Sequence, residues 1–71
     1  MREIFGIHLQ QLRKENGMTQ ERLAELADLD VTYISLLERG KRQPTLHTLE
    51  KVAKAFEIKT WQLVEYIETK L

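Results

Sequence analysis

Apolar residues recur along this chain at spacings of three and four, as in helices that pack through one face, and no segment shows the sustained alternation of a strand. The pattern predicts five helices. The first spans roughly residues 3–16, and the others begin after Thr19, Asp30, Thr45 and Thr60. Thr19 and Asp30 are good N-caps, because their side-chain oxygens can accept hydrogen bonds from free amides of the first turn. The expected fold class is all-α, a compact five-helix bundle.

The same periodicity selects a candidate core on the inner faces of these helices. We expect it to include Phe5, Leu9, Leu12, Leu23, Leu26, Ala27, Ile34, Leu37, Leu49, Val52, Ala53, Phe56, Ile58 and Leu63. Gly17 and Gly40 each follow a helical pattern, where a left-handed residue at the helix end favours glycine. Gly6 lies inside the first helix and is expected to cost up to ~1 kcal/mol relative to alanine.

The length of 71 residues predicts one domain, residues 1–71, with no room for a second. The absence of cysteine excludes disulfides and thiolate metal sites, and the two histidines, His8 and His47, lie far apart without ligand-like neighbours. No apolar run approaches the ~20 residues of a membrane span, and the N-terminus has no signal-peptide pattern. We expect a cytoplasmic domain with no metal, no cofactor, no membrane association and no small-molecule ligand.

The charges cancel over the whole chain but are segregated along it. Residues 20–38 carry five acidic side chains against one basic one, a net of −4, and residues 39–54 carry the reverse, a net of +4. The densest basic run, Arg39, Lys41 and Arg42, directly follows the third predicted helix. A local cluster of basic residues of this kind can serve DNA binding. The acidic residues elsewhere in the chain predict only modest non-specific affinity for DNA.

The second and third predicted helices are short, with about three residues between them, and small residues, Ala24 and Ala27, at their crossing. With Ile34 and Leu37 buried, the outward face of the third helix would carry Val31, Thr32, Ser35 and Leu36. Short side chains let a helix backbone approach the base edges of the major groove. This face has no side chain for bidentate pairing with guanine or adenine, so thymine methyl groups are its natural partners.

Three segments carry a resemblance to a known family: LRKENGMTQERLAELADL at residues 12–29, YISLLERGKRQP at residues 33–44 and LEKVAKAF at residues 49–56. The chain resembles Cro/lambda-repressor-type (XRE-type) helix-turn-helix domains over nearly its whole length. The stretch DLDVTYISLLERG is further similar to the small controller proteins of restriction–modification systems. The resemblance implies a lambda-repressor-like fold that binds double-stranded DNA as a homodimer on a pseudo-palindromic operator. Those controllers usually have arginine where this chain has Val31, which changes the expected base preference.

The resemblance also assigns roles to individual residues. It places Val31, Thr32, Ser35 and Leu36 at base-reading positions of a recognition helix, residues 31–39. The expected phosphate contacts are Gln20, Tyr33, Arg39, Lys41, Arg42 and Gln43. Arg13 and Glu38 occupy the positions of a partly buried ion pair that joins the first helix to the third.

The last helix offers a candidate dimer interface of Trp61, Val64, Tyr66 and Ile67, with Leu71 nearby. A large aromatic residue at the first position of that helix exceeds what packing within a monomer requires. Because a two-fold dimer aligns two recognition helices, their spacing should be about 34 Å, one turn of B-DNA.

Other interpretations remain open at this point. The zero net charge and the acidic second helix are compatible with an antitoxin or a protein-interaction module built on the same fold. The chain could also be the DNA-binding domain of a longer repressor, although Met1 and the charged end at Lys70 favour an intact short protein. No general base lies beside a nucleophile, so we expect no catalytic residues and no enzyme activity. The sequence does not identify the operator or the regulated gene, and it does not show whether the protein activates or represses transcription.

Overall fold

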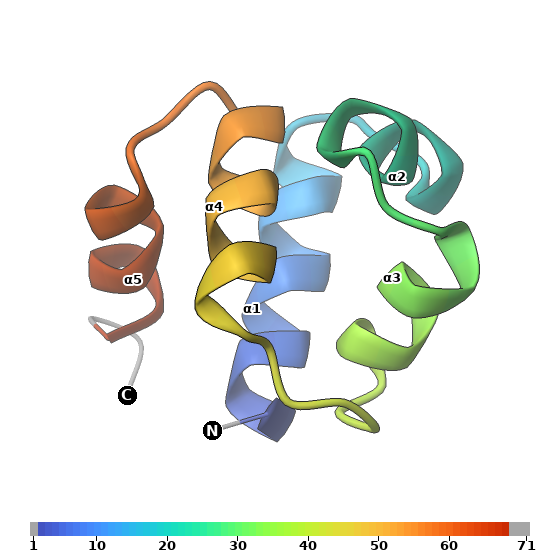
Figure 1. The fold of residues 1–71 in the computed structure, drawn as a ribbon, viewed down its shortest axis with the longest axis horizontal. Helices are drawn as coiled ribbons and strands as arrows, with labels where there is room; N and C mark the ends of the chain where they lie inside the picture. Colours follow the sequence, from blue (N-terminus) through green and yellow to red (C-terminus); the bar gives the residue numbers. More distant parts are fainter. Residues whose placement is uncertain (1, 69–71) are drawn as a thin grey trace.

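Five helices follow one another along residues 2–68, the part of the chain that the computed structural model describes (Figure 1). They are α1 Arg2–Glu15, α2 Gln20–Ala27, α3 Val31–Glu38, α4 Leu46–Ala55 and α5 Thr60–Glu68. Within these residues there is no strand. The predicted all-α class is therefore confirmed, with each helix within a few residues of its expected start.

Side-chain caps define where most of these helices begin. Thr19, Asp30 and Thr45 each accept a hydrogen bond from a backbone amide in the first turn. The donors are Arg22, Thr32 and Thr48, at 3.0, 2.8 and 3.1 Å. Helix α5 begins at Thr60 itself, one residue before the expected start, and there Gln62 Oε1 accepts from the backbone amide of Lys59 at 2.7 Å.

Helices α1 to α4 all end in one hydrogen-bonded motif, in which a left-handed residue directs two amides back to the last turn. At the end of α4, for example, the Glu57 amide donates to Lys54 and the Ile58 amide to Ala53, both at 3.0 Å. The left-handed residues are Gly17, Asp28, Gly40 and Glu57, with φ of 66°, 55°, 71° and 58°. The two glycines were expected, whereas Asp28 and Glu57 were not, because L side chains disfavour this conformation.

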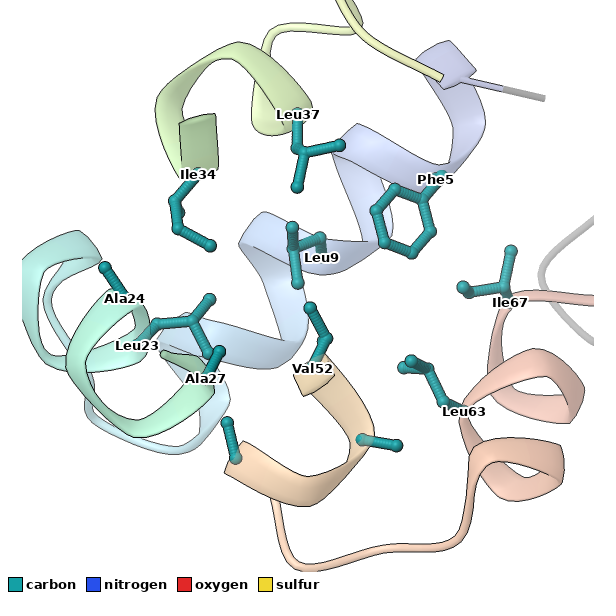
Figure 2. Close-up of a cluster of buried hydrophobic side chains, with 12 residues drawn as sticks. Phe5, Leu9, Leu23, Ala24, Ala27, Ile34, Leu37, Val52, Leu63 and Ile67 are labelled. Atoms are coloured by element: carbon teal, nitrogen blue, oxygen red, sulfur yellow. The ribbon is translucent and has the colours of Figure 1, made fainter. Parts of the chain in front are cut away.

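The hydrophobic core lies among the five helices: α1 packs against α3 and α5, α2 packs against α3 and α4, and α4 packs against α5 (Figure 1). Phe5, Leu9, Leu23, Ile34, Leu37, Val52 and Leu63 are fully buried, as predicted. Figure 2 shows Leu9 of α1 among side chains that come from the other helices. Leu26, expected in the core, is 37% exposed on the outer side of α2, so that expectation was wrong.

Ile67 is also corrected by the structure. It was expected on the exposed face of the last helix, but its side chain is only 3% exposed. Figure 2 shows it beside Leu63 among the core side chains. The two residues are four apart and therefore lie on the same face of α5. Its burial belongs to the fold of the monomer.

Gly6 lies where α1 closely approaches the last turn of α3. A Cβ atom there would lie 2.7 Å from the carbonyl oxygen of Glu38 and closer still to that of Leu37. Both obstacles are backbone atoms of the last turn of α3, which no side-chain rotation can move. The glycine that looked like a propensity cost in the sequence is therefore what allows this helix crossing.

Candidate nucleic-acid interface

Helix α3 lies at one edge of the bundle, at the opposite end from α5 (Figure 1). Ile34 and Leu37 are both fully buried and fix its inner face to the core. On its outer side Thr32 is exposed and Val31 is 38% exposed. Ser35 and Leu36 are half-buried. The four residues expected to read bases thus retain accessible surface on one short helix.

The segment that follows α3 is basic and exposed. Arg39, Lys41, Arg42 and Gln43 are all exposed, between the end of α3 and the start of α4. None of the three cations forms an ion pair with another residue of the described range 2–68. The amide of Lys41 donates to Leu36 at 2.9 Å and so ties the segment to α3. The structure therefore holds these cations directly after the last turn of α3.

Tyr33, expected to contact phosphate, is connected to the start of α4. Its hydroxyl lies 3.0 Å from Thr48 Oγ1, and Thr48 Oγ1 lies 3.0 Å from Thr45 Oγ1. The Tyr33 ring is half-buried and packs against the core. This chain of hydroxyl groups links α3 to the start of α4.

Arg13 and Glu38 are brought together as a buried ion pair between α1 and α3. The Nε of Arg13 donates to Glu38 Oε2 at 2.6 Å and its Nη2 donates to Oε1 at 3.1 Å. The side chains are 10% and 1% exposed. The remaining guanidinium nitrogen Nη1 donates to the carbonyl of Met18 at 2.7 Å. The pair thus connects α1, the turn before α2, and the end of α3.

Gln20 adds a member to this cluster that the sequence did not suggest. It is the first residue of α2, and its Nε2 donates to Glu38 Oε1 at 2.9 Å. The two residues are far apart in sequence and meet only through the crossing of α2 and α3. No sequence signal could have revealed the contact without that crossing.

The four residues proposed for a dimer interface occupy different environments. Trp61 is 63% exposed, Val64 is half-buried and Ile67 is in the core. Tyr66 is half-buried, lies edge-on to the His8 ring at 6.4 Å and donates from its hydroxyl to Glu15 at 3.4 Å. Burial, reinforced by the nearby Glu15 carboxylate, raises the pKa of Tyr66.

The surface of the bundle has further features near these residues. Leu46, at the start of α4, belongs to the apolar pattern of that helix but is 68% exposed. A cavity of about 190 Å³ lies between α5 and the end of the basic segment, lined by Phe5, Gln43, Pro44, Leu49, Val64 and Ile67. Leu71 lies outside the described residues. Within residues 2–68 no group of side chains is arranged to hold a metal ion, and no helix there could span a membrane.

Comparison with known proteins places this arrangement in a family. The helix-turn-helix family profile matches residues 9–60. Control protein C.MunI of Mycoplasma sp is 43% identical over 65 residues, which cover 90% of this chain and 88% of that protein. Control protein C.BamHI of Bacillus amyloliquefaciens is 39% identical over 67 residues, covering 93% of this chain and 83% of that protein.

A solved structure adds the three-dimensional likeness. The restriction–modification controller protein C.Esp1396I, as a tetramer in complex with its natural 35 base-pair operator, superposes with a TM-score of 0.87 at 35% identity. The match covers 96% of this chain and 90% of that chain. This chain belongs to the helix-turn-helix family of the Cro/lambda-repressor (XRE) type, and restriction–modification controller proteins are among its relatives.

Proposed function

We propose that this chain is a sequence-specific transcriptional regulator that binds double-stranded DNA by inserting α3 into the major groove. The observation that carries the proposal is the combination of two features: a candidate recognition helix fixed by Ile34 and Leu37, and exposed cations directly after it that form no ion pair within residues 2–68. The relatives support it, since one solved controller is described in complex with its operator. Residues 1–71 would act as one domain, in the cytoplasm, where DNA is accessible.

Base reading would fall to Val31, Thr32, Ser35 and Leu36. These side chains supply methyl groups and hydroxyls, but none of the amide or guanidinium groups that pair bidentately with adenine or guanine. Specificity should therefore rest on thymine methyl groups and on the shape of the DNA between half-sites. Arg39 and Gln43, at the edge of the groove, would add to it.

The protein would act as a homodimer on a pseudo-palindromic operator. One short helix reads few bases. A two-fold dimer would place two recognition helices about 34 Å apart and so double the number of base pairs that are read. Trp61 and Val64 supply accessible apolar surface on α5, and Tyr66 borders it. The buried Ile67 would support this contact from within the monomer.

Phosphate contacts would come from Arg39, Lys41, Arg42 and Gln43, with Gln20 and Tyr33. The test is the salt dependence of binding to a duplex that the wild-type protein recovers from a random-sequence pool. Each phosphate neutralised contributes a log–log slope of about −0.9, so Lys41→Ala should flatten the slope by roughly one unit for each subunit. Lys59→Ala, which removes an exposed cation before α5, is the matched control and should leave the slope unchanged.

Two results would contradict this proposal. Unchanged slopes for Arg39→Ala, Lys41→Ala and Arg42→Ala alike would reject the basic segment as the phosphate clamp. Failure of the wild-type protein to enrich any duplex would reject sequence-specific DNA binding and favour a protein-interaction module or antitoxin on the same fold.

A further inference from the structure

The carboxylate of Glu38 accepts more hydrogen bonds than an ion pair with Arg13 requires. Its Oε2 accepts from Arg13 Nε, while its Oε1 accepts both from Arg13 Nη2, at 3.1 Å, and from Gln20 Nε2, at 2.9 Å. The Glu38 side chain is 1% exposed, so its acceptor positions are sheltered from competing water. The third hydrogen bond leads from this buried cluster to the first residue of α2.

This hydrogen bond determines how the Gln20 amide is oriented. An ionised carboxylate can only accept hydrogen bonds, so the amide must turn its nitrogen, and not its oxygen, toward Glu38. One Nε2 proton is then committed to Glu38, and the second forms no hydrogen bond with another residue of the described chain. Because Gln20 is half-buried, part of its side chain remains at the surface, beside the start of α2.

The start of α2 is where a DNA phosphate would bind under the proposed function, on which this inference rests. The first amides of a helix and its dipole favour an anion. A flexible glutamine loses conformational entropy when it is fixed by a ligand, whereas one already held by the protein loses less. Fixing Gln20 before DNA arrives therefore strengthens the phosphate contact without adding an atom to the interface.

We propose that Glu38 is a positioning residue for DNA binding, whose buried carboxylate holds the Gln20 amide so that its remaining N–H is presented to a backbone phosphate. Arg13 is the other half of this arrangement, because its two hydrogen bonds fix the position of the Glu38 carboxylate. The same buried cluster that joins α1 to α3 thus also sets the geometry of a contact made by α2.

The test must remove the acceptor without leaving a buried charge unpaired, since a lone buried ion would destabilise the fold. The double variant Arg13→Met, Glu38→Leu does so and leaves the net charge unchanged. In the free protein, NMR would follow solvent exchange of the Gln20 side-chain amide. For the Nε2 proton that is donated to Glu38, we expect slow exchange in the wild type and, in the double variant, exchange as fast as that of the exposed Gln10 amide. Chemical unfolding would verify that each variant is folded.

DNA binding is measured on the duplex recovered by the wild-type protein. The double variant should bind about two- to tenfold more weakly for each half-site, the range for leaving one flexible side chain unfixed. Its salt slope should remain that of the wild type, because no cation contact is lost. In a Gln20→Met background the same pair of changes should alter affinity by less than about twofold, since the residue through which Glu38 acts is absent.

Each result decides the proposal. The role of Glu38 would be overturned if the double variant bound DNA with wild-type affinity. It would also be overturned if the affinity losses of the double variant and of Gln20→Met multiplied in the combined variant. Both conclusions hold even if DNA binding itself is established. Fast exchange of both Gln20 side-chain amide protons in the wild-type protein would overturn the role of Glu38 as well. Recovery of no duplex by the wild type would instead overturn the proposed function, and this inference with it.

Discussion

Replacing Gly6 by alanine tests the packing that positions α3. In an isolated helix, Gly→Ala is stabilising by ~1 kcal/mol, so helix propensity alone predicts a more stable protein. The structure predicts the opposite. The new methyl group would lie 2.7 Å from the carbonyl oxygen of Glu38 and 3.0 Å from its carbonyl carbon.

The magnitude follows from which atoms obstruct the methyl group. Carbon and oxygen atoms in contact normally lie about 3.3 Å or more apart, and here the oxygen belongs to the backbone of α3. Relief therefore requires α1 and α3 to separate by a few tenths of an ångström or more. Overpacking of this kind typically costs 1–3 kcal/mol, and the propensity gain offsets about 1 kcal/mol of it. Because two backbone oxygens would lie closer than 3.0 Å to the methyl group, the cost should fall in the upper half of that range, and we expect a net loss of roughly 1–2 kcal/mol in the free energy of unfolding.

Urea unfolding measures this loss as a lower midpoint at an unchanged slope. The matched control is Gln10→Ala, an exposed position one turn further along α1, which should change stability by less than ~0.5 kcal/mol. A Gly6→Ala protein as stable as the wild type, or more stable, would refute the close crossing of α1 and α3.

Two further changes test the end of α4 and the surface of α5. Glu57→Gly should raise the free energy of unfolding by about 0.5 kcal/mol. Glycine removes the steric cost of a left-handed backbone, and this gain exceeds the entropy that glycine adds to the unfolded state. A less stable variant would contradict this. Trp61→Ala should shift the sedimentation of the protein toward monomer while leaving it folded, since the ring is 63% exposed. Ile7→Ala, at 61% exposure on α1, is its control, and equal dimerisation of both variants would place the interface elsewhere.

Much of this architecture could be predicted from the sequence because its signals are local. Apolar spacing and the caps at Thr19, Asp30 and Thr45 define where helices lie and begin. The basic segment after α3 is visible in the sequence as a charge run. Gly17 was predicted to end α1 because a left-handed position favours glycine.

What could not be predicted depends on how the helices cross. Periodicity identifies one face of α5 as apolar, but it does not show that α1 and α4 cover that face at Ile67. The requirement for Gly6 follows only from the position of the α3 carbonyls, and the Gln20–Glu38 hydrogen bond only from the crossing of α2 and α3. Glu57 occupies a left-handed position that its side chain disfavours, so propensity points away from it.

The most direct test of the central claim is to select DNA from a random-sequence pool with the wild-type protein and with Val31→Arg. Val31 is 38% exposed on the first turn of α3, so the substitution should leave the fold intact. We predict that the wild type recovers a two-fold symmetric sequence with thymines facing α3, and that the variant changes one position in each half-site toward guanine, the base that arginine pairs with bidentately. Recovery of the same sequence by both proteins, or of no sequence by either, would contradict base reading by this helix.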